Sequence, residues 1–104
     1  MAWVLLLLAG LFEVGFTTAL RFTDGFTRTG PTLVFFAFAA ASFYLLTQAS
    51  QVIALGTAYA VWTGIGAAGT VAVGLIYFAE PVTTLRLVFL AALIGSIIGL
   101  KLVA

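Results

Sequence analysis

The sequence contains no cysteine and no histidine, and only 7% of its 104 residues are charged. Without cysteine the chain forms no disulfide and has no thiol nucleophile, and without histidine it lacks the commonest zinc ligand and general base. Its four basic and three acidic side chains leave a net charge of +1, which provides no basic surface for nucleic acid. We therefore expect no metal site, no cofactor, no nucleic-acid partner and no enzymatic activity.

The scarcity of charge also identifies the solvent of this chain. Soluble domains carry about 25% charged residues, whereas this chain is 64% hydrophobic. Its apolar stretches are continuous and do not alternate with polar residues, which fits membrane helices and not barrel strands. Polar breaks leave four spans close to the roughly 20 residues that cross a bilayer: 3–20, 31–49, 57–78 and 85–103. The sequence predicts an all-α membrane protein, with a single four-helix transmembrane domain over residues 1–104.

The connections between these spans are short, so neighbouring helices should run antiparallel and both termini should lie on one side of the membrane. The first and third connections carry Arg21, Arg28 and Arg86, whereas the opposite side carries only Lys101. This difference is a small positive-inside bias. We expect that the chain can insert in both orientations, with the first loop favouring the cytoplasm.

Small residues recur every four positions in the last span, at Ala91, Gly95 and Gly99. Such a stripe lets two membrane helices approach closely. Four helices of this length cannot by themselves enclose a generous aqueous cavity, so the stripe predicts a dimer formed through this helix. Packing within the monomer is the alternative interpretation.

Glu13 lies near the middle of the first span. An acid at that depth costs on the order of 2.5–3.5 kcal/mol to insert, and such residues are usually functional. Burial disfavours the charged carboxylate, so the group can hold a proton or an organic cation, but poorly both. Competition of a proton and a cation for one carboxyl group is sufficient for proton/cation exchange. The alternative is a structural carboxyl group, although no other acid or base lies inside a span to pair with it.

The helical face that carries Glu13 in the first span includes Gly10, Phe16 and Thr17. Gly10 would leave room beside the carboxylate, and Thr17 would donate a hydrogen bond to it. Phe16 offers an aromatic ring to a cation. These properties predict that all three line a substrate site.

Polar and aromatic residues of the second and third spans complete the predicted site. Tyr59, Trp62 and Thr63 fall on one face of the third span, and Ser42 is the most central polar residue of the second. Trp62 offers the best cation–π surface among the side chains. The alternative for Tyr59 and Trp62 is membership of an interfacial aromatic belt.

The run from Gly64 to Gly69 matches the dinucleotide fingerprint G-x-G-x-x-G. The fingerprint requires a preceding strand and a βαβ unit, whereas this run lies inside an apolar span. We interpret Gly64 and Gly66 as marks of a flexible or closely packed helix that bends when the protein changes its open side.

At these positions the sequence resembles the small multidrug resistance family of bacterial exporters over nearly its whole length. The matching segments are Gly10-Leu-Phe-Glu13-Val, Asp24-Gly-Phe-Thr-Arg28, Ser42-Phe-Tyr-Leu-Leu46, Gly56-Thr-Ala-Tyr59-Ala-Val-Trp62-Thr-Gly-Ile-Gly66, Glu80-Pro81 and Gly99-Leu-Lys101. The resemblance implies an antiparallel dimer of dual topology in the bacterial cytoplasmic membrane. It also implies that Glu13 binds protons and substrate in alternation, that Tyr59, Trp62 and Ser42 line the same site, and that Lys101 lies near the end of a dimerising helix.

Two branches of the family share features with this chain. Gly10 and the third and fourth spans resemble the guanidinium exporters, which usually place a tryptophan where this chain has Phe16. The run Gly15-Phe-Thr-Thr18 resembles the branch that exports quaternary ammonium and aromatic cations. A phenyl ring lacks the indole N–H donor and makes a less directional site, so we expect broader hydrophobic or quaternary cations.

The residues and the resemblance together predict a proton-coupled antiporter that exports small organic cations, namely quaternary ammonium, aromatic or guanidinyl compounds. An antiparallel homodimer is the expected assembly, and a heterodimer with a paralogous chain remains open. The alternative function is a non-transporting or obligate heterodimer subunit that modulates a partner membrane chain.

Overall fold

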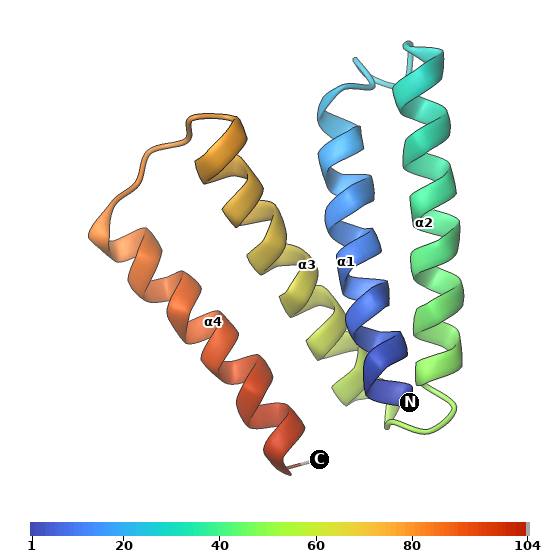
Figure 1. The fold of residues 1–104 in the computed structure, drawn as a ribbon, viewed down its shortest axis with the longest axis vertical. Helices are drawn as coiled ribbons and strands as arrows, with labels where there is room; N and C mark the ends of the chain where they lie inside the picture. The colour runs from blue at the N-terminus through green and yellow to red at the C-terminus, as the bar shows by residue number, and fades with distance from the viewer. Residues whose placement is uncertain (104) are drawn as a thin grey trace.

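A computed structural model describes residues 1–103, and within them the chain forms four α-helices and no strand (Figure 1). The helices are α1 (Ala2–Arg21), α2 (Thr29–Ala49), α3 (Leu55–Tyr77) and α4 (Thr84–Val103). Their ends lie within about two residues of the ranges expected from the polar breaks. All four are long and apolar enough to cross a membrane, so the predicted all-helical membrane architecture is confirmed.

Successive helices run antiparallel, and both termini lie at the same end of the molecule, at the bottom of Figure 1. Helix α1 lies between α2 and α3, and α4 packs against the outer side of α3 (Figure 1). The molecule measures 41 × 35 × 17 Å. Because a helix with its side chains is about 10–12 Å wide, the shortest dimension holds little more than one layer of helices.

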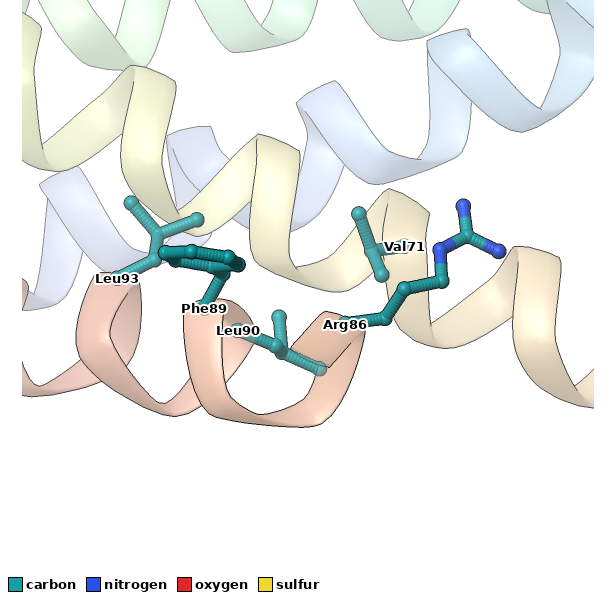
Figure 2. Close-up of a pocket in the computed structure, with 5 residues that line it drawn as sticks. All are labelled: Val71, Arg86, Phe89, Leu90 and Leu93. Atoms are coloured by element: carbon teal, nitrogen blue, oxygen red, sulfur yellow. The ribbon is translucent and has the colours of Figure 1, made fainter. Parts of the chain in front are cut away.

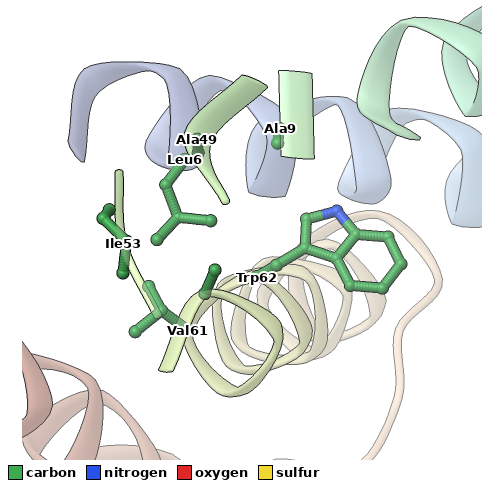
Figure 3. Close-up of a cluster of buried hydrophobic side chains, with 7 residues drawn as sticks. Leu6, Ala9, Ala49, Ile53, Val61 and Trp62 are labelled. Carbon is green, nitrogen blue, oxygen red and sulfur yellow. The ribbon is translucent and has the colours of Figure 1, made fainter. Parts of the chain in front are cut away.

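The few buried hydrophobic side chains gather at the terminal end of this layer. Figure 3 shows part of this cluster, where Leu6 and Ala9 of α1 meet Val61 and Trp62 of α3. Ala49 at the end of α2 and Ile53 in the following connection close it, with Ala58 of α3. This cluster fixes α1, α2 and α3 relative to one another.

Helix α4 is held more loosely, and none of its described residues is buried. It approaches α3 closely at Gly64, where an added Cβ would lie 2.9 Å from the Ile97 side chain. Toward the third loop the two helices diverge around an apolar pocket of about 290 Å³ (Figure 2). Its walls are Val71, Phe89, Leu90 and Leu93, with Arg86 at the loop end.

The third loop is closed by Arg86. Its guanidinium group donates to the Pro81 carbonyl oxygen at 2.9 Å and lies 3.5 Å from a Glu80 carboxylate oxygen. The Glu80 carboxylate also lies against Gly74, where an added Cβ would come within 2.6 Å of it. The charge of Arg86 is therefore engaged within its own loop.

Candidate cation-binding site

Glu13 lies at the centre of α1 and points toward α3. Its side chain is partly buried, and its Oε1 atom is buried with no hydrogen-bond partner within residues 1–103. The carboxyl group lies directly against Gly66, and a Cβ atom at Gly66 would overlap it. Gly66 therefore makes the space that the carboxyl group occupies, a role that the sequence analysis did not assign to it.

Gly10 and Gly64 serve helix packing. An added Cβ at Gly10 would lie 2.5 Å from the Ile65 side chain, so the space that Gly10 leaves is filled by α3 and is not open beside the carboxylate. Gly64 is likewise packed against Ile97. Since α3 is continuous from Leu55 to Tyr77, bending at Gly64 and Gly66 stays a prediction.

Thr17 is close to Glu13 but bonds its main chain. The Thr17 hydroxyl donates to the Glu13 carbonyl oxygen at 2.9 Å and shares a 2.6 Å hydrogen bond with the Thr70 hydroxyl of α3. A hydroxyl has a single proton to donate, so Thr17 fits this pair as a donor to the main chain and an acceptor from Thr70. The predicted bond from Thr17 to the carboxylate is absent from the described structure.

A buried chain of hydrogen bonds joins α1, α2 and α3 next to the aromatic residues of the site. The indole N–H of Trp62 donates to the Ser42 hydroxyl at 2.9 Å, and Ser42 donates to the Ala9 carbonyl oxygen at 2.7 Å. In Figure 3 the ring nitrogen of Trp62 lies on the side of the indole nearer Ala9. The N–H of Trp62 is thus committed to holding the helices, which leaves only its ring for a substrate.

An aromatic row crosses the three helices beside Glu13. The ring centroids of Phe16 and Phe43 lie 6.3 Å apart, those of Phe43 and Trp62 lie 5.3 Å apart, and those of Trp62 and Tyr59 lie 5.8 Å apart. Phe16 follows Glu13 by three residues, so the two share a helical face. Three of these rings, Phe16, Tyr59 and Trp62, are predicted from the sequence, whereas Phe43 is not.

Exposure differs sharply along this row. Tyr59 and Phe43 are 58% and 51% exposed, whereas Trp62 is only 7% exposed. Thr63, the other predicted lining residue of α3, is also exposed. The row therefore offers open rings on α2 and α3, with Trp62 fixed between them.

This arrangement has the chemistry of a monocation site. It combines one acid without a partner and several ring faces, which attract cations through their quadrupoles. Within the described residues no group of histidine, cysteine, aspartate and glutamate side chains could hold a metal ion.

Comparison with known proteins agrees with this chemistry. The model of the family described as Small Multidrug Resistance protein matches residues 1–94. The chain belongs to the small multidrug resistance family. Similar members include proteins named guanidinium exporter from Yersinia pseudotuberculosis, Salmonella typhimurium and Proteus vulgaris, each 43% identical over 102 residues. These alignments cover 98% of this chain and 97–98% of each relative.

Membership of the small multidrug resistance family makes the chain a multi-pass membrane protein and a small-cation efflux transporter. Its matched relatives are exporters and not enzymes. The predicted family resemblance and the predicted absence of an enzymatic role are both confirmed.

The small-residue stripe of this family member faces away from the rest of the chain. Added Cβ atoms at Gly95 and Gly99 would meet no atom within 4 Å, and Ala91 is exposed. Packing within the monomer, the alternative interpretation of the stripe, therefore does not account for it. The dimer that it predicts remains a prediction.

Proposed function

We propose that this protein is a proton-coupled antiporter that exports small organic cations by alternating access, with proton and cation competing for Glu13. The observation that carries the proposal is the buried carboxyl oxygen of Glu13, which has no partner in the described chain. A polar atom buried in an apolar span without a hydrogen bond is costly. Binding of a proton or of a cation removes that cost.

Competition at one carboxyl group is sufficient to couple the two movements. A bare carboxylate is disfavoured by its apolar surroundings. The protein therefore changes the side to which its site is open most readily when the carboxylate is neutralised. A proton neutralises it covalently, and a cation does so as an ion pair whose apolar parts rest on the aromatic row. Because one occupant excludes the other, movement of the cation outward is exchanged for movement of the proton inward.

The proposed substrates are guanidinyl compounds together with aromatic or quaternary ammonium cations. The relatives named guanidinium exporter support the first class. Phe16 supports the second, because its ring has no N–H donor to orient a planar guanidinium group. The exposed rings of Phe43 and Tyr59 would receive the hydrophobic part of either.

The proposed assembly is an antiparallel homodimer in the bacterial cytoplasmic membrane, joined through the stripe Ala91, Gly95 and Gly99. Support comes from the thinness of the single chain, 17 Å in its shortest dimension, and from the uncovered stripe on α4. A second copy facing the Glu13 side would enclose the bound cation, which a single layer of helices leaves exposed.

Electrogenic transport in proteoliposomes tests the proposal. The purified chain is given guanidinium, phenylguanidinium and tetrapropylammonium in turn, under an imposed proton gradient. We expect saturable currents that reverse with the proton gradient. Glu13→Gln should abolish them, whereas the matched loop variant Glu80→Gln should retain them.

The pattern of currents also separates the substrate classes. Currents with guanidinium alone would place the chain with the selective exporters, and currents with the two bulkier cations would make it a multidrug exporter. Silence with all three cations would contradict export by this chain alone and favour a heterodimer. Cation-driven proton movement that survives Glu13→Gln would refute the competition mechanism.

A further inference from the structure

An apolar groove runs along the outside of the layer between α1, α3 and α4. It consists of two adjoining pockets of about 380 and 390 Å³ that share Leu7, Ile65, Ile97 and Ile98. We call it the α1–α4 groove. It begins beside Lys101 and ends at Ala72.

The α1–α4 groove is separate from the candidate cation-binding site. Neither Glu13 nor any ring of the aromatic row lines either pocket. The groove also does not use the small-residue stripe, since Ala91, Gly95 and Gly99 are absent from its walls. Transport chemistry and the predicted dimer interface therefore leave its occupant unexplained.

The length of the groove matches one leaflet of a bilayer. Its α3 wall extends from Val61 to Ala72, and eleven steps of about 1.5 Å along a helix give roughly 16 Å. Half of the hydrocarbon core of a bilayer is about 15 Å. A single acyl chain that enters at the membrane boundary would thus fill the groove to its end.

The open end of the groove carries a cation without an acidic partner in the described chain. Lys101 lies in the last turn of α4, and its Nζ is 5.6 Å from the centroid of the Trp3 ring. The only ion pair within residues 1–103 joins Arg86 to Glu80, so the ammonium group of Lys101 has no anionic partner among these residues. Lysine and tryptophan at a helix end are suited to the headgroup region of a membrane.

The pocket of Figure 2 provides an internal comparison. It is also apolar and also has a cation at its rim, but Arg86 is engaged by Glu80 and by the Pro81 carbonyl oxygen. Its volume is about 290 Å³. Of the two rims, only that of the α1–α4 groove leaves a positive charge free for a ligand.

We propose that the α1–α4 groove binds one acyl chain of an anionic phospholipid, with the headgroup phosphate on Lys101 beside Trp3. The apolar walls take the chain, and the unpaired ammonium group selects a headgroup of net negative charge. This inference does not depend on the transport mechanism proposed above.

Native mass spectrometry of the purified chain tests the lipid site. The detergent-solubilised protein is mixed with equal amounts of phosphatidylglycerol and phosphatidylcholine that carry identical acyl chains. We expect retention of phosphatidylglycerol over phosphatidylcholine by about fivefold, the effect of one basic residue near an anionic headgroup. Lys101→Gln should abolish the preference, and Lys101→Arg should keep it.

A second pair of variants tests the groove itself. Ala68→Leu places extra volume in the α3 wall and should reduce the retention of both lipids. Ala40→Leu, on an exposed part of α2 that does not line the groove, should leave retention unchanged. Equal retention of the two lipids by the unmodified chain would overturn the proposal, as would a preference that survives Lys101→Gln. Loss of oligomers with Ala68→Leu, without loss of lipid, would instead make the groove a contact between copies.

Discussion

At the scale of single residues, the candidate site depends on a missing side chain. The Glu13 carboxyl group occupies the space where Gly66 has no Cβ. The carboxyl group can therefore sit against the α3 backbone, at the level that follows Trp62 by one turn. The position of the only intramembrane acid is thus set jointly by its own helix and by a glycine on another.

Gly66→Ala should therefore displace the carboxyl group or force α1 away from α3. Alanine favours helix by up to about 1 kcal/mol over glycine, so loss of helix stability is not expected. Overpacking costs about 1–3 kcal/mol, and we expect proton-coupled transport to fall by about tenfold or more. Gly56 lies in the first turn of the same helix, and a Cβ atom added there would meet no atom within 4 Å. Gly56→Ala is therefore the matched control for proteoliposome currents. Unchanged transport in Gly66→Ala would contradict this role.

Ser42 holds the three helices together at the level of Trp62. Ser42→Ala removes the acceptor of the Trp62 N–H and the donor to the Ala9 carbonyl oxygen. Interhelical hydrogen bonds in membranes contribute about 0.6–1.7 kcal/mol, so we expect a loss of stability in that range, measured by unfolding in mixed detergent micelles. Ser96→Ala removes only a bond within α4, to the Ala92 carbonyl oxygen, and should cost less. Equal losses in the two variants would count against the bridging role.

Residue-scale roles were only partly predictable from the sequence. Glu13 stands out because an acid inside an apolar span is rare. Phe43 does not, because the sequence of α2 does not select which of its many apolar side chains face a neighbour. Gly66 stands out as a glycine, but its contact with Glu13 follows only from the placement of α3 against α1. Thr17 was predicted to donate to the carboxylate, whereas its hydroxyl donates to main-chain carbonyl oxygens of α1.

At the scale of elements, the helices were predictable because the bilayer permits few alternatives. Hydrocarbon thickness fixes the length of a span, and backbone hydrogen bonding fixes its conformation. The rotation and tilt of each helix are not fixed in this way. They follow from local contacts, such as Gly10 against Ile65 and Gly64 against Ile97, which appear only once the helices are placed together.

Helix α4 is the element whose proposed role is assembly. Ala91→Leu adds volume to the stripe, on a side of α4 that is uncovered in the described part of the chain, and should weaken self-association while leaving the monomer folded. Ala92→Leu is the same substitution at a neighbouring exposed position off the stripe. Chemical cross-linking in membranes should show fewer dimers for Ala91→Leu alone. Identical yields for both variants would exclude the stripe as the interface.

At the scale of the whole molecule, the distribution of charge controls insertion. Arg21 ends α1, Arg28 precedes α2 and Arg86 lies in the first turn of α4, whereas Lys101 lies in the last turn of α4. Because successive helices run antiparallel (Figure 1), the three arginines lie at the opposite end from Lys101. By the positive-inside rule, the side whose loops carry more Lys and Arg near the membrane tends to face the cytoplasm. A difference this small predicts a mixture of orientations.

The absence of cysteine allows this mixture to be measured without background labelling. Thr27→Cys in the first loop should react with an impermeant maleimide in both intact cells and inverted vesicles. Combining it with Arg28→Gln and Gln51→Arg moves one charge across the membrane and should enrich the orientation with the second loop in the cytoplasm. Labelling from one side only, before and after the charge is moved, would contradict dual insertion.

The shared side of the two termini constrains how copies of this protein can be joined. Fusing the end of one copy directly to the start of the next keeps both copies in the same orientation, because no crossing of the membrane separates them. A genetic tandem of the proposed antiparallel pair needs one additional transmembrane segment as its linker. A fusion without that segment would thus hold two parallel copies, and a fusion with it would hold two antiparallel copies.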